Sequence, residues 1–262
     1  MQYEHLLVDI EGPVATVTLN RNDVHNAMDE QTLAEMADVF QHLGKPGQAR
    51  VIVLKANGPD FCAGADIRWM KRASGYTPAK NRKDAMRLVK MIEAIDLCPV
   101  PVIGMVHGGV YGGGLGVVAA CDIVVAETQT KMCFSECRLG ILPAVVSSVV
   151  LPKIGLSHTR RLYLTSELFG MDIAQRVGLV HEVGSSDEVE GIVNRLIRDI
   201  LRNGPNAVRM SKTYLSKMAD LPYKKRVKLS LDTLVKARSS AEGKEGLSAF
   251  LEKRKASWVS ER

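Results

Sequence analysis

At 262 residues the chain is too long for a minimal domain and suffices for one large domain or two modest ones. With 46% hydrophobic and 24% charged residues, it has the composition of an ordinary globular protein and can bury a core of normal size. The 35 basic and 29 acidic residues leave a net charge of +6. This charge suits an anionic ligand such as a phosphorylated cofactor; the alternatives are a nucleic acid partner or a role in solubility alone.

The cysteines and the N-terminus argue against several classes of protein. The five cysteines are odd in number, form no Cys-x-x-Cys pair and have no histidine near Cys133 and Cys137. Neither a zinc site nor a disulfide framework is therefore expected, and reduced thiols are typical of the cytoplasm. The N-terminal segment lacks the basic-then-apolar order of a signal peptide, and no uncharged apolar run of about 18 residues occurs without glycine. We expect a cytoplasmic protein with no metal site and no membrane span.

In chain order, the hydrophobic pattern predicts an alternation of strands and helices over the first 185 residues. Strands are expected at 6–10, 14–19, 51–55, 101–106, 122–126 and 178–183. Helices are expected at 30–43, 67–72, 80–97, 115–121, 157–164 and 172–177. In the helix at 80–97, the side chains expected to face inward are Ala85, Leu88, Val89, Ile92 and Ile95.

From Ser186 onward the strand-like runs stop and only helices with basic faces are expected. These helices cover 187–202, 205–218, 225–237 and 240–255. We therefore divide the chain into an α/β core over residues 1–203 and a helical region over residues 204–262. The helical region is expected to pack on a neighbouring element or on another subunit.

The glycine-rich stretch at 99–143 is the most informative part of the sequence. A strand-length apolar run is followed by glycines and then by a small-residue helix, whose N-terminus offers unpaired N–H groups and favours negative charge. It is not a dinucleotide fingerprint, because Val117 stands where the third glycine belongs, and no Gly-Lys-Ser/Thr of a phosphate loop follows. Tight packing of a helix on a strand is the structural alternative.

Two further features extend this picture. The segment FCAGAD (61–66) supplies a second small-residue turn, and one N–H group from each turn could polarise a carbonyl oxygen. Glu136 is a candidate acid or base, because its apolar neighbours predict partial burial and a raised pKa, although it could also be an exposed residue at a strand end. Asp122 and His107 are expected to make structural hydrogen bonds. The basic helix at 80–97 is interpreted as a solvated face.

Several segments, in the right order, resemble the enoyl-CoA hydratase/isomerase (crotonase) superfamily. They are LNRNDVHNAMD (19–29), FCAGAD (61–66), the stretch 101–126, FSECRLGILP (134–143), GLVHEV (178–183) and EGLSAFLEKRKASW (245–258). The resemblance implies an α/β fold, a crotonase-like spiral of repeated ββα units with a C-terminal helical trimerisation region. It implies homotrimers that pair into hexamers, and an acyl-CoA thioester substrate. No metal and no cofactor are implied, since coenzyme A is part of the substrate.

The resemblance also assigns roles to individual residues. The oxyanion hole would be formed by the backbone N–H groups of Ala65 and Gly113, and Glu136 would be the second of the two family glutamates. Lys253 matches a basic residue that reaches the CoA of a neighbouring subunit. The adenine and pantetheine of CoA would pass along Ala27, Ala63, Asp66 and Ile67.

The sequence departs from the family at the first glutamate, which maps onto Gly116. This departure is similar to the bacterial methylglutaconyl-CoA hydratase branch, which acts in leucine and branched-terpenoid catabolism. The resemblance therefore implies a lyase that hydrates a branched enoyl-CoA, with Arg72 or Arg138 as a partner for a distal substrate carboxylate. The alternatives are an isomerase, a decarboxylase or a polyketide carrier-protein dehydratase of the same fold. A non-catalytic RNA-binding protein is a remote alternative.

Overall fold

The computed structural model describes residues 1–219 and 221–259. The strands are β1 (Leu6–Glu11), β2 (Val14–Leu19), β3 (Val51–Ala56), β4 (Val102–Val106), β5 (Gly109–Tyr111), β6 (Ile123–Glu127), β7 (Lys131–Cys133) and β8 (Glu182–Gly184). The first helices are α1 (Glu30–Leu43), α2 (Ile67–Ala73), α3 (Pro78–Asp96), α4 (Gly113–Ala120) and α5 (Ser147–Thr165). They are followed by α6 (Met171–Arg176), α7 (Val189–Leu201), α8 (Pro205–Met218), α9 (Tyr223–Ser239) and α10 (Ala241–Leu251). Two 3-10 helices, η1 (Asn22–Val24) and η2 (Glu136–Leu139), lie in connections.

The main sheet has the strand order β1-β2-β3-β4-β6-β8. Strands β1 and β2 form an antiparallel hairpin, and every later pairing in this sheet is parallel. Strands β5 and β7 form a separate parallel pair beside it. Parallel neighbours need a crossover, and the helices α1, α3 and α4 supply it between successive strands.

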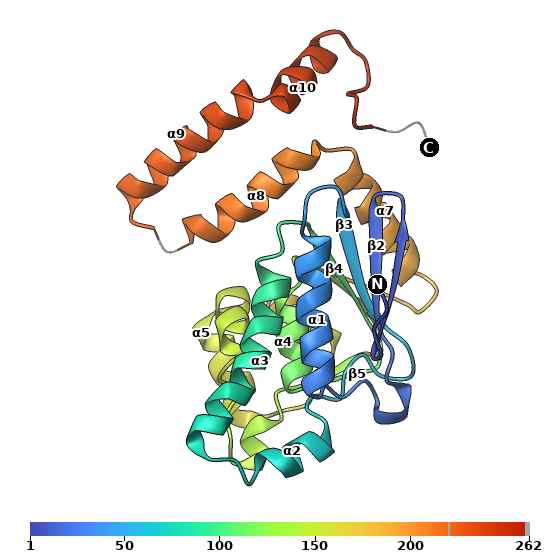
Figure 1. The fold of residues 1–262 in the computed structure, drawn as a ribbon, viewed down its shortest axis with the longest axis vertical. Coiled ribbons are helices and arrows are strands. Elements are labelled where there is room, and N and C mark those ends of the chain that lie inside the picture. Colours follow the sequence, from blue (N-terminus) through green and yellow to red (C-terminus); the bar gives the residue numbers. More distant parts are fainter. Residues whose placement is uncertain (220, 260–262) are drawn as a thin grey trace.

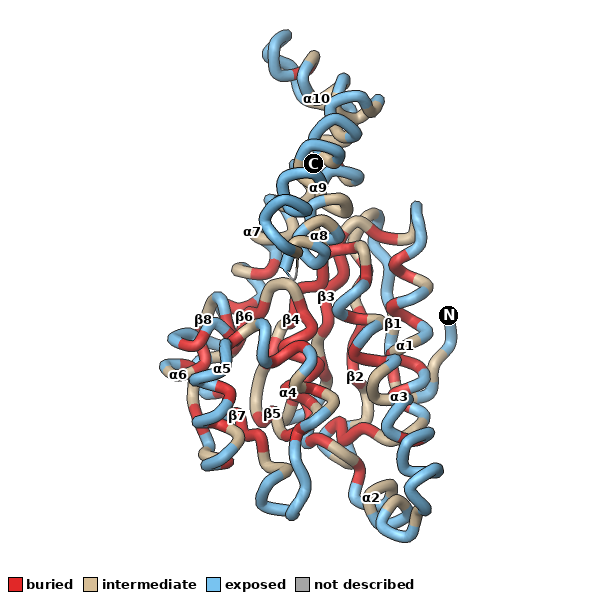
Figure 2. Tube along the Cα trace, turned by 90° about the vertical axis from the view of Figure 1, so that its left-hand side faces the viewer, coloured by how far each residue is buried: buried red, intermediate tan, exposed pale blue. Residues whose placement is uncertain are grey.

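The two faces of the main sheet are covered by different helices (Figure 1). Side chains alternate along β3, so that Ile52 and Leu54 enter the core shared with α1, α3 and α4. Val51 and Val53 point the other way, into a smaller core with Val189 and other apolar residues of α7. The inner strands β2, β3, β4 and β6 are therefore largely buried, as the red segments in Figure 2 show, whereas the edge strand β1 is mostly exposed.

Helices α8 to α10 leave this body as an arm, most of which is exposed to solvent (Figures 1 and 2). Two basic residues of α8 fasten the arm. Arg209 donates to the carbonyl of Gly44 at 2.6 Å, and the Lys212 ammonium lies 2.6 Å from Asp122 Oδ2. Asp122 also accepts the N–H of Val102 at 2.7 Å, which confirms its predicted structural role.

Most predicted elements are confirmed, and two predictions were wrong. The helix predicted at 157–164 is confirmed as the second half of α5, which bends at Gly155 with φ of 75°. The strand predicted at 178–183 is confined to β8. On α3, Ala85 is exposed instead of buried. Its neighbour Asp84 points inward because the indole N–H of Trp69 donates to its carboxylate at 2.9 Å.

Candidate active site

The glycine-rich turn after β5 starts the buried helix α4. Gly112 has φ of 49° and ψ of −121°, a conformation that side-chain-bearing residues avoid, and it serves as the N-cap of α4. Gly113 is the first residue of the helix, so its N–H group has no partner within α4. The turn therefore presents a backbone donor at the positive end of a helix dipole.

The FCAGAD turn lies directly against this glycine turn. The N–H of Cys62 donates to the carbonyl of Gly109 at 3.2 Å, and the N–H of Tyr111 donates to the carbonyl of Cys62 at 2.9 Å. Gly64 has φ of 95°, and a Cβ atom there would lie 3.1 Å from the carbonyl oxygen of Tyr111. The fold thus brings together two turns that are about fifty residues apart in the sequence, as the oxyanion-hole interpretation requires.

Met28 links the two proposed oxyanion-hole donors. It pairs with Ala65 in a short parallel bridge, in which the N–H of Met28 donates to Gly64 and the N–H of Asp66 donates to Met28. The methyl end of Met28 also lies 3.1 Å from where a Cβ atom of Gly113 would stand. Within residues 1–219 and 221–259, neither Ala65 N–H nor Gly113 N–H has an acceptor. Both N–H groups are therefore unpaired in the described part of the chain, and Met28 contacts the segments that carry them.

Glu136 lies beside the start of α4. It is the first residue of η2, and its Oε1 atom is 3.3 Å from where a Cβ atom of Gly112 would stand. Its Oε2 atom is buried and has no hydrogen-bond partner in the described part of the chain. Burial raises the pKa of the Glu136 carboxyl, as predicted. This carboxyl can therefore be protonated at a higher pH than an exposed glutamate, which suits a group that takes up and returns a proton.

The position of the missing first glutamate is closed by another side chain. A Cβ atom at Gly116 would lie 2.8 Å from Val146 Cβ and closer still to Val146 Cγ1, and 3.2 Å from Ile92 Cδ1. Val146 and Ile92 are both buried. Position 116 therefore has no room for a carboxylate side chain unless Val146 moves.

The four residues expected along CoA differ in what they expose. Ala63 and Ile67 are exposed, whereas Ala27 is buried and its carbonyl accepts from Arg21. Asp66 is also buried, and its carboxylate accepts the N–H of Arg68 at 2.8 Å and pairs with Arg21 at 3.1 Å. The carboxylate of Asp66 is therefore engaged in capping α2 and in pairing with Arg21.

The remaining basic candidates occupy different places. Lys253 is exposed just after α10, and the arm that carries α10 lies at the opposite end of the molecule from α2 (Figure 1). Arg72 is exposed and pairs with Glu30 at 2.6 Å. Arg138 shares η2 with Glu136, and one of its nitrogens donates to the carbonyl of Ser166 at 2.5 Å.

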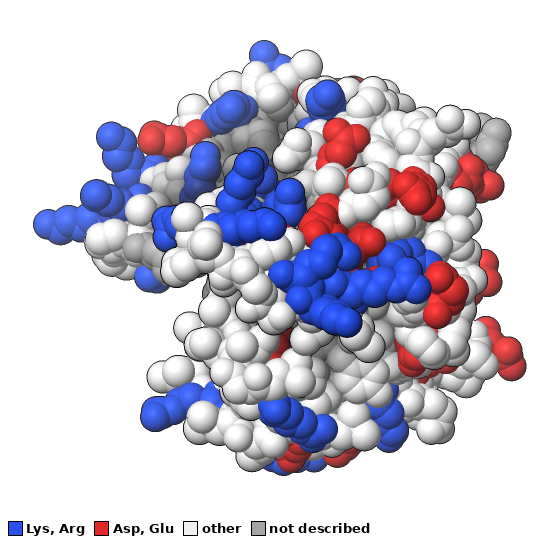
Figure 3. Space-filling view, turned by 60° about the horizontal axis from the view of Figure 1, so that its bottom comes forward, with Lys and Arg blue, Asp and Glu red and all other residues white. Residues whose placement is uncertain are grey.

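A basic surface lies at the end of the molecule that carries α2. Figure 3 shows Lys and Arg side chains gathered on this face. Helix α2 and the start of α3 lie at this end and contribute exposed side chains of Arg68, Lys71, Arg72, Lys80, Arg82 and Lys83. The FCAGAD turn runs directly into α2, so this positive surface is adjacent to one of the two turns.

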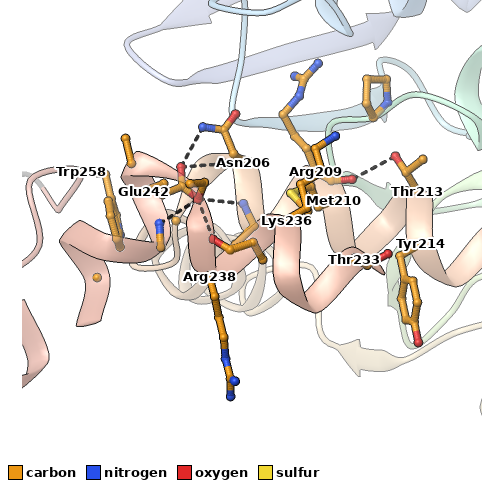
Figure 4. A pocket seen from close by; sticks show the side chains of 18 of the residues that line it. Asn206, Arg209, Met210, Thr213, Tyr214, Thr233, Lys236, Arg238, Glu242 and Trp258 are labelled. Atoms are coloured by element: carbon orange, nitrogen blue, oxygen red, sulfur yellow. Dashed lines mark hydrogen bonds between the residues drawn. The ribbon is translucent and has the colours of Figure 1, made fainter. Parts of the chain in front are cut away.

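One cavity lies away from these residues, in the arm. It measures about 890 Å³ and is bounded by α8, α9 and α10 (Figure 4). Glu242 of α10 lies at one side, where its carboxylate accepts the N–H groups of Asn206 and Ala207 at the start of α8. The space is therefore a gap between arm helices and does not contain the two turns or Glu136.

Across residues 1–219 and 221–259, no group of three or more histidine, cysteine or acidic side chains is arranged to hold a metal ion. No helix in the same residues has both the length and the apolar character to cross a membrane.

Sequence reasoning missed two residues that shape this site. Met28 belongs to the LNRNDVHNAMD segment that carries the family resemblance, so its place beside the two turns had a signal in the sequence. Val146 had none, because its contact with Gly116 joins residues thirty positions apart on different helices.

Comparisons with known proteins agree with the fold. Residues 9–261 match the enoyl-CoA hydratase/isomerase family. The crotonyl-CoA hydratase of Syntrophomonas wolfei is 29% identical over 262 residues, which cover 99% of this chain and 100% of that protein. The structure of an enoyl-CoA hydratase from Shewanella pealeana has a TM-score of 0.94 at 34% identity, covering 98% of this chain and 97% of that one. AtuE from Pseudomonas aeruginosa has a TM-score of 0.95 at 31% identity, covering 98% and 100%. These similarities confirm the predicted crotonase-like α/β fold, and the chain belongs to the enoyl-CoA hydratase/isomerase family.

Proposed function

We propose that this protein is an enoyl-CoA hydratase, a lyase that adds water to the double bond of a branched enoyl-CoA. The observation that carries the proposal is the position of Glu136, whose buried carboxyl lies against the N-cap of α4. This carboxyl thus lies beside the residue that precedes Gly113, one of the two proposed backbone donors. Names of relatives such as the crotonyl-CoA hydratase support the same reaction class.

In the proposed reaction, the thioester oxygen accepts the N–H groups of Ala65 and Gly113. These donors stabilise the enolate that forms when water attacks C3, because they are fixed before charge develops on the oxygen. Glu136 takes the proton of the attacking water and then delivers it to C2. One carboxylate serves both steps, since Val146 fills the space where a second would stand.

For the acyl group we propose 3-methylglutaconyl-CoA, with 3-hydroxy-3-methylglutaryl-CoA as the product, in leucine or terpenoid catabolism. The support is the glycine at position 116, which is similar to the methylglutaconyl-CoA hydratase branch. Such a substrate carries its own distal carboxylate. Arg138, which shares η2 with Glu136, is the basic residue that we expect to pair with it.

The CoA portion is proposed to run along the outer side of the FCAGAD turn. Exposed Ala63 and Ile67, together with the backbone at Ala27 and Asp66, would contact the adenine and pantetheine. The basic surface at α2 would attract the phosphates of CoA. We further propose a homotrimer or a hexamer made of two trimers, in which Lys253 reaches the CoA bound by a neighbouring copy, and a cytoplasmic location.

The test combines a substrate panel with one variant. Crotonyl-CoA, 3-methylcrotonyl-CoA and 3-methylglutaconyl-CoA are supplied, and the loss of the conjugated double bond is followed. Glu136→Gln should lower kcat by about a hundredfold or more, because an acid–base group is lost, and should leave binding of the CoA ester nearly unchanged. Glu4→Gln, at a carboxylate that is 77% exposed, is the control and should keep full activity. Undiminished hydration by Glu136→Gln would refute the assignment of Glu136 as the acid–base group.

A double-bond isomerase is the second candidate, because an isomerase needs only one proton-moving group and position 116 supplies no second carboxylate. It predicts that the substrate panel yields a shifted double bond and no hydroxyacyl product. The same product analysis also reports decarboxylation. Dehydration of a substrate bound to a carrier protein would appear only when the acyl group is offered on that carrier.

A further inference from the structure

A site with a single carboxylate leaves one task unassigned, namely holding the water molecule that attacks C3. In the family pattern that position belongs to the first glutamate, but Val146 closes the space at Gly116. Any replacement must come from another element that reaches Glu136. Helix α5 begins at Ser147, directly after Val146, and its second half ends at Thr165 after the bend at Gly155.

The bend brings the two ends of α5 together. Ser147 Oγ donates to the carbonyl of Pro143 at 2.7 Å and lies 3.2 Å from the hydroxyl oxygen of Tyr163. Two residues sixteen positions apart therefore form one hydroxyl pair. Because Pro143 and Ser147 are both held in place, the position of the Tyr163 hydroxyl is also restricted.

The Tyr163 ring is fixed on its other side by Phe134. The two ring centroids are 4.7 Å apart at an interplanar angle of 54°, and Phe134 in turn stacks on Phe169 at 6.3 Å. Phe134 is fully buried and lies two residues before Glu136, so one aromatic contact joins the Tyr163 ring to the segment that carries the carboxylate.

Glu136 and Tyr163 are also linked electrostatically. Burial is the main cause that raises the pKa of the Tyr163 hydroxyl, and the neighbouring Glu136 charge raises it further, whereas Ser147 lowers it. Tyr163 is therefore a neutral phenol at neutral pH. A neutral phenol can hold a water molecule with an oxygen lone pair, but it does not compete with Glu136 for the proton.

We propose that the Tyr163 hydroxyl, held by Ser147 and Phe134, positions the water molecule that Glu136 activates. The inference rests on the hydratase function proposed above. One hydrogen of the water would point to Tyr163 and the other to Glu136, leaving a lone pair of the water oxygen for the substrate.

The step balances without any further reactant. The water oxygen forms a bond to C3, the C2=C3 electron pair moves to the thioester oxygen as an enolate, and one water proton passes to Glu136. The enolate then collapses, and C2 takes that proton from Glu136. Tyr163 neither gains nor loses a proton, so its role is to place the water and not to act as an acid or a base.

Tyr163→Phe tests this role, because it keeps the ring against Phe134 and removes only the hydroxyl. Two reactions are compared in the same protein. Hydration of the best enoyl-CoA needs positioned water, whereas exchange of the C2 protons of butyryl-CoA in D₂O needs only Glu136 and the two N–H donors. We expect kcat for hydration to fall by about a hundredfold with KM nearly unchanged, and proton exchange to stay within about twofold of the unaltered protein.

Two more variants sharpen the comparison. Ser147→Ala removes the partner of the phenol and should lower hydration in the same direction but less. Tyr3→Phe is the matched control, because it deletes a hydroxyl that bonds to Asp38 at 2.7 Å, and it should leave both reactions unchanged. Thermal unfolding followed by circular dichroism shows whether each variant is folded.

Each outcome tests either the water-positioning role of Tyr163 or the proposed hydratase function. Equal losses of hydration and proton exchange in Tyr163→Phe would mean that Tyr163 only supports the fold around Glu136, and the inference is wrong. Full hydration by Tyr163→Phe, in a protein that hydrates the panel, also refutes the inference and leaves the proposed function standing. If the unaltered protein hydrates no enoyl-CoA but still exchanges C2 protons, the hydratase function falls and the water-holding role falls with it.

Discussion

At the scale of single residues, Glu136 combines a functional advantage with a structural cost. The burial that raises its pKa also means that the folded protein binds the proton more tightly than the unfolded chain does. The contribution of this group to stability is therefore greatest at low pH, below the unfolded pKa of about 4.3. It is lost as the pH rises through the higher pKa of the folded state.

Glu136→Gln should consequently stabilise the protein in a pH-dependent manner. Glutamine has nearly the same shape and carries no charge, so it avoids the cost of burying a carboxylate. We expect Tm of the variant to exceed that of the unaltered protein at pH 7 and the difference to shrink toward about pH 4. Thermal unfolding at a series of pH values measures it. A difference that does not vary with pH would contradict the assigned burial of the charge.

At the scale of elements, the contact between α4 and α5 shapes the site. Gly116 of α4 faces Val146 at the start of α5 so closely that even one methyl group would overlap it. The absence of a side chain at position 116 therefore permits the close packing of α4 against α5, and it also leaves the site with one carboxylate. It also means that a glutamate at position 116 can place a second carboxylate in the site only if Val146 moves.

Gly116→Ala is expected to destabilise the protein by about 1–3 kcal/mol, the usual cost of overpacking a well-filled core. A helical glycine normally gains stability when it becomes alanine, so the loss would come from the contact with Val146. Gly191→Ala in α7 is the matched control, because nothing lies within 4 Å of a Cβ atom there. Urea unfolding should show opposite shifts for the two variants. Equal effects would mean that Val146 moves aside without cost.

How far the sequence predicts these elements depends on the range of the interactions. The β1–β2 hairpin and the helices of the arm follow from local periodicity, and both are confirmed. Strands β5 and β7 have three residues each and exist because they pair with each other, so no local pattern announces them. The inward rotation of Asp84 depends on Trp69, which lies fifteen residues earlier in the chain and on another helix.

The features of the candidate site also separate into those that local sequence predicts and those that depend on contacts between distant residues. The raised pKa of Glu136 was predicted from its immediate apolar neighbours, because burial there is a local property. No local pattern predicts the contact between the two turns, because the bond from Tyr111 to Cys62 spans 49 residues. The Ser147–Tyr163 pair and the closure at Gly116 were not predicted, because each depends on where α5 packs.

At the scale of the whole molecule, the arm exposes several large apolar side chains to solvent. The large side chains of α9 and α10 that face solvent include Leu231 at 59%, Val235 at 63% and Phe250 at 81% exposure. Contiguous exposed apolar surface usually marks an interaction site. A second copy of the chain is the expected occupant, consistent with the proposed trimer, and Lys253 lies at the end of the same arm.

The proposed assembly can be separated from the proposed contact of Lys253 with CoA by two variants. Phe250→Asp places a charge in the expected interface, so the molar mass from light scattering should fall from that of a trimer or hexamer toward that of one chain. Lys253→Ala should leave the mass unchanged and raise KM several-fold, because one charged contact with CoA is lost while Glu136 and the N–H donors are intact. Phe250→Asp should raise KM by a similar factor, since a neighbouring copy no longer supplies its lysine. A monomeric unaltered protein would refute the assembly, and an unchanged KM in Lys253→Ala would refute the contact between subunits.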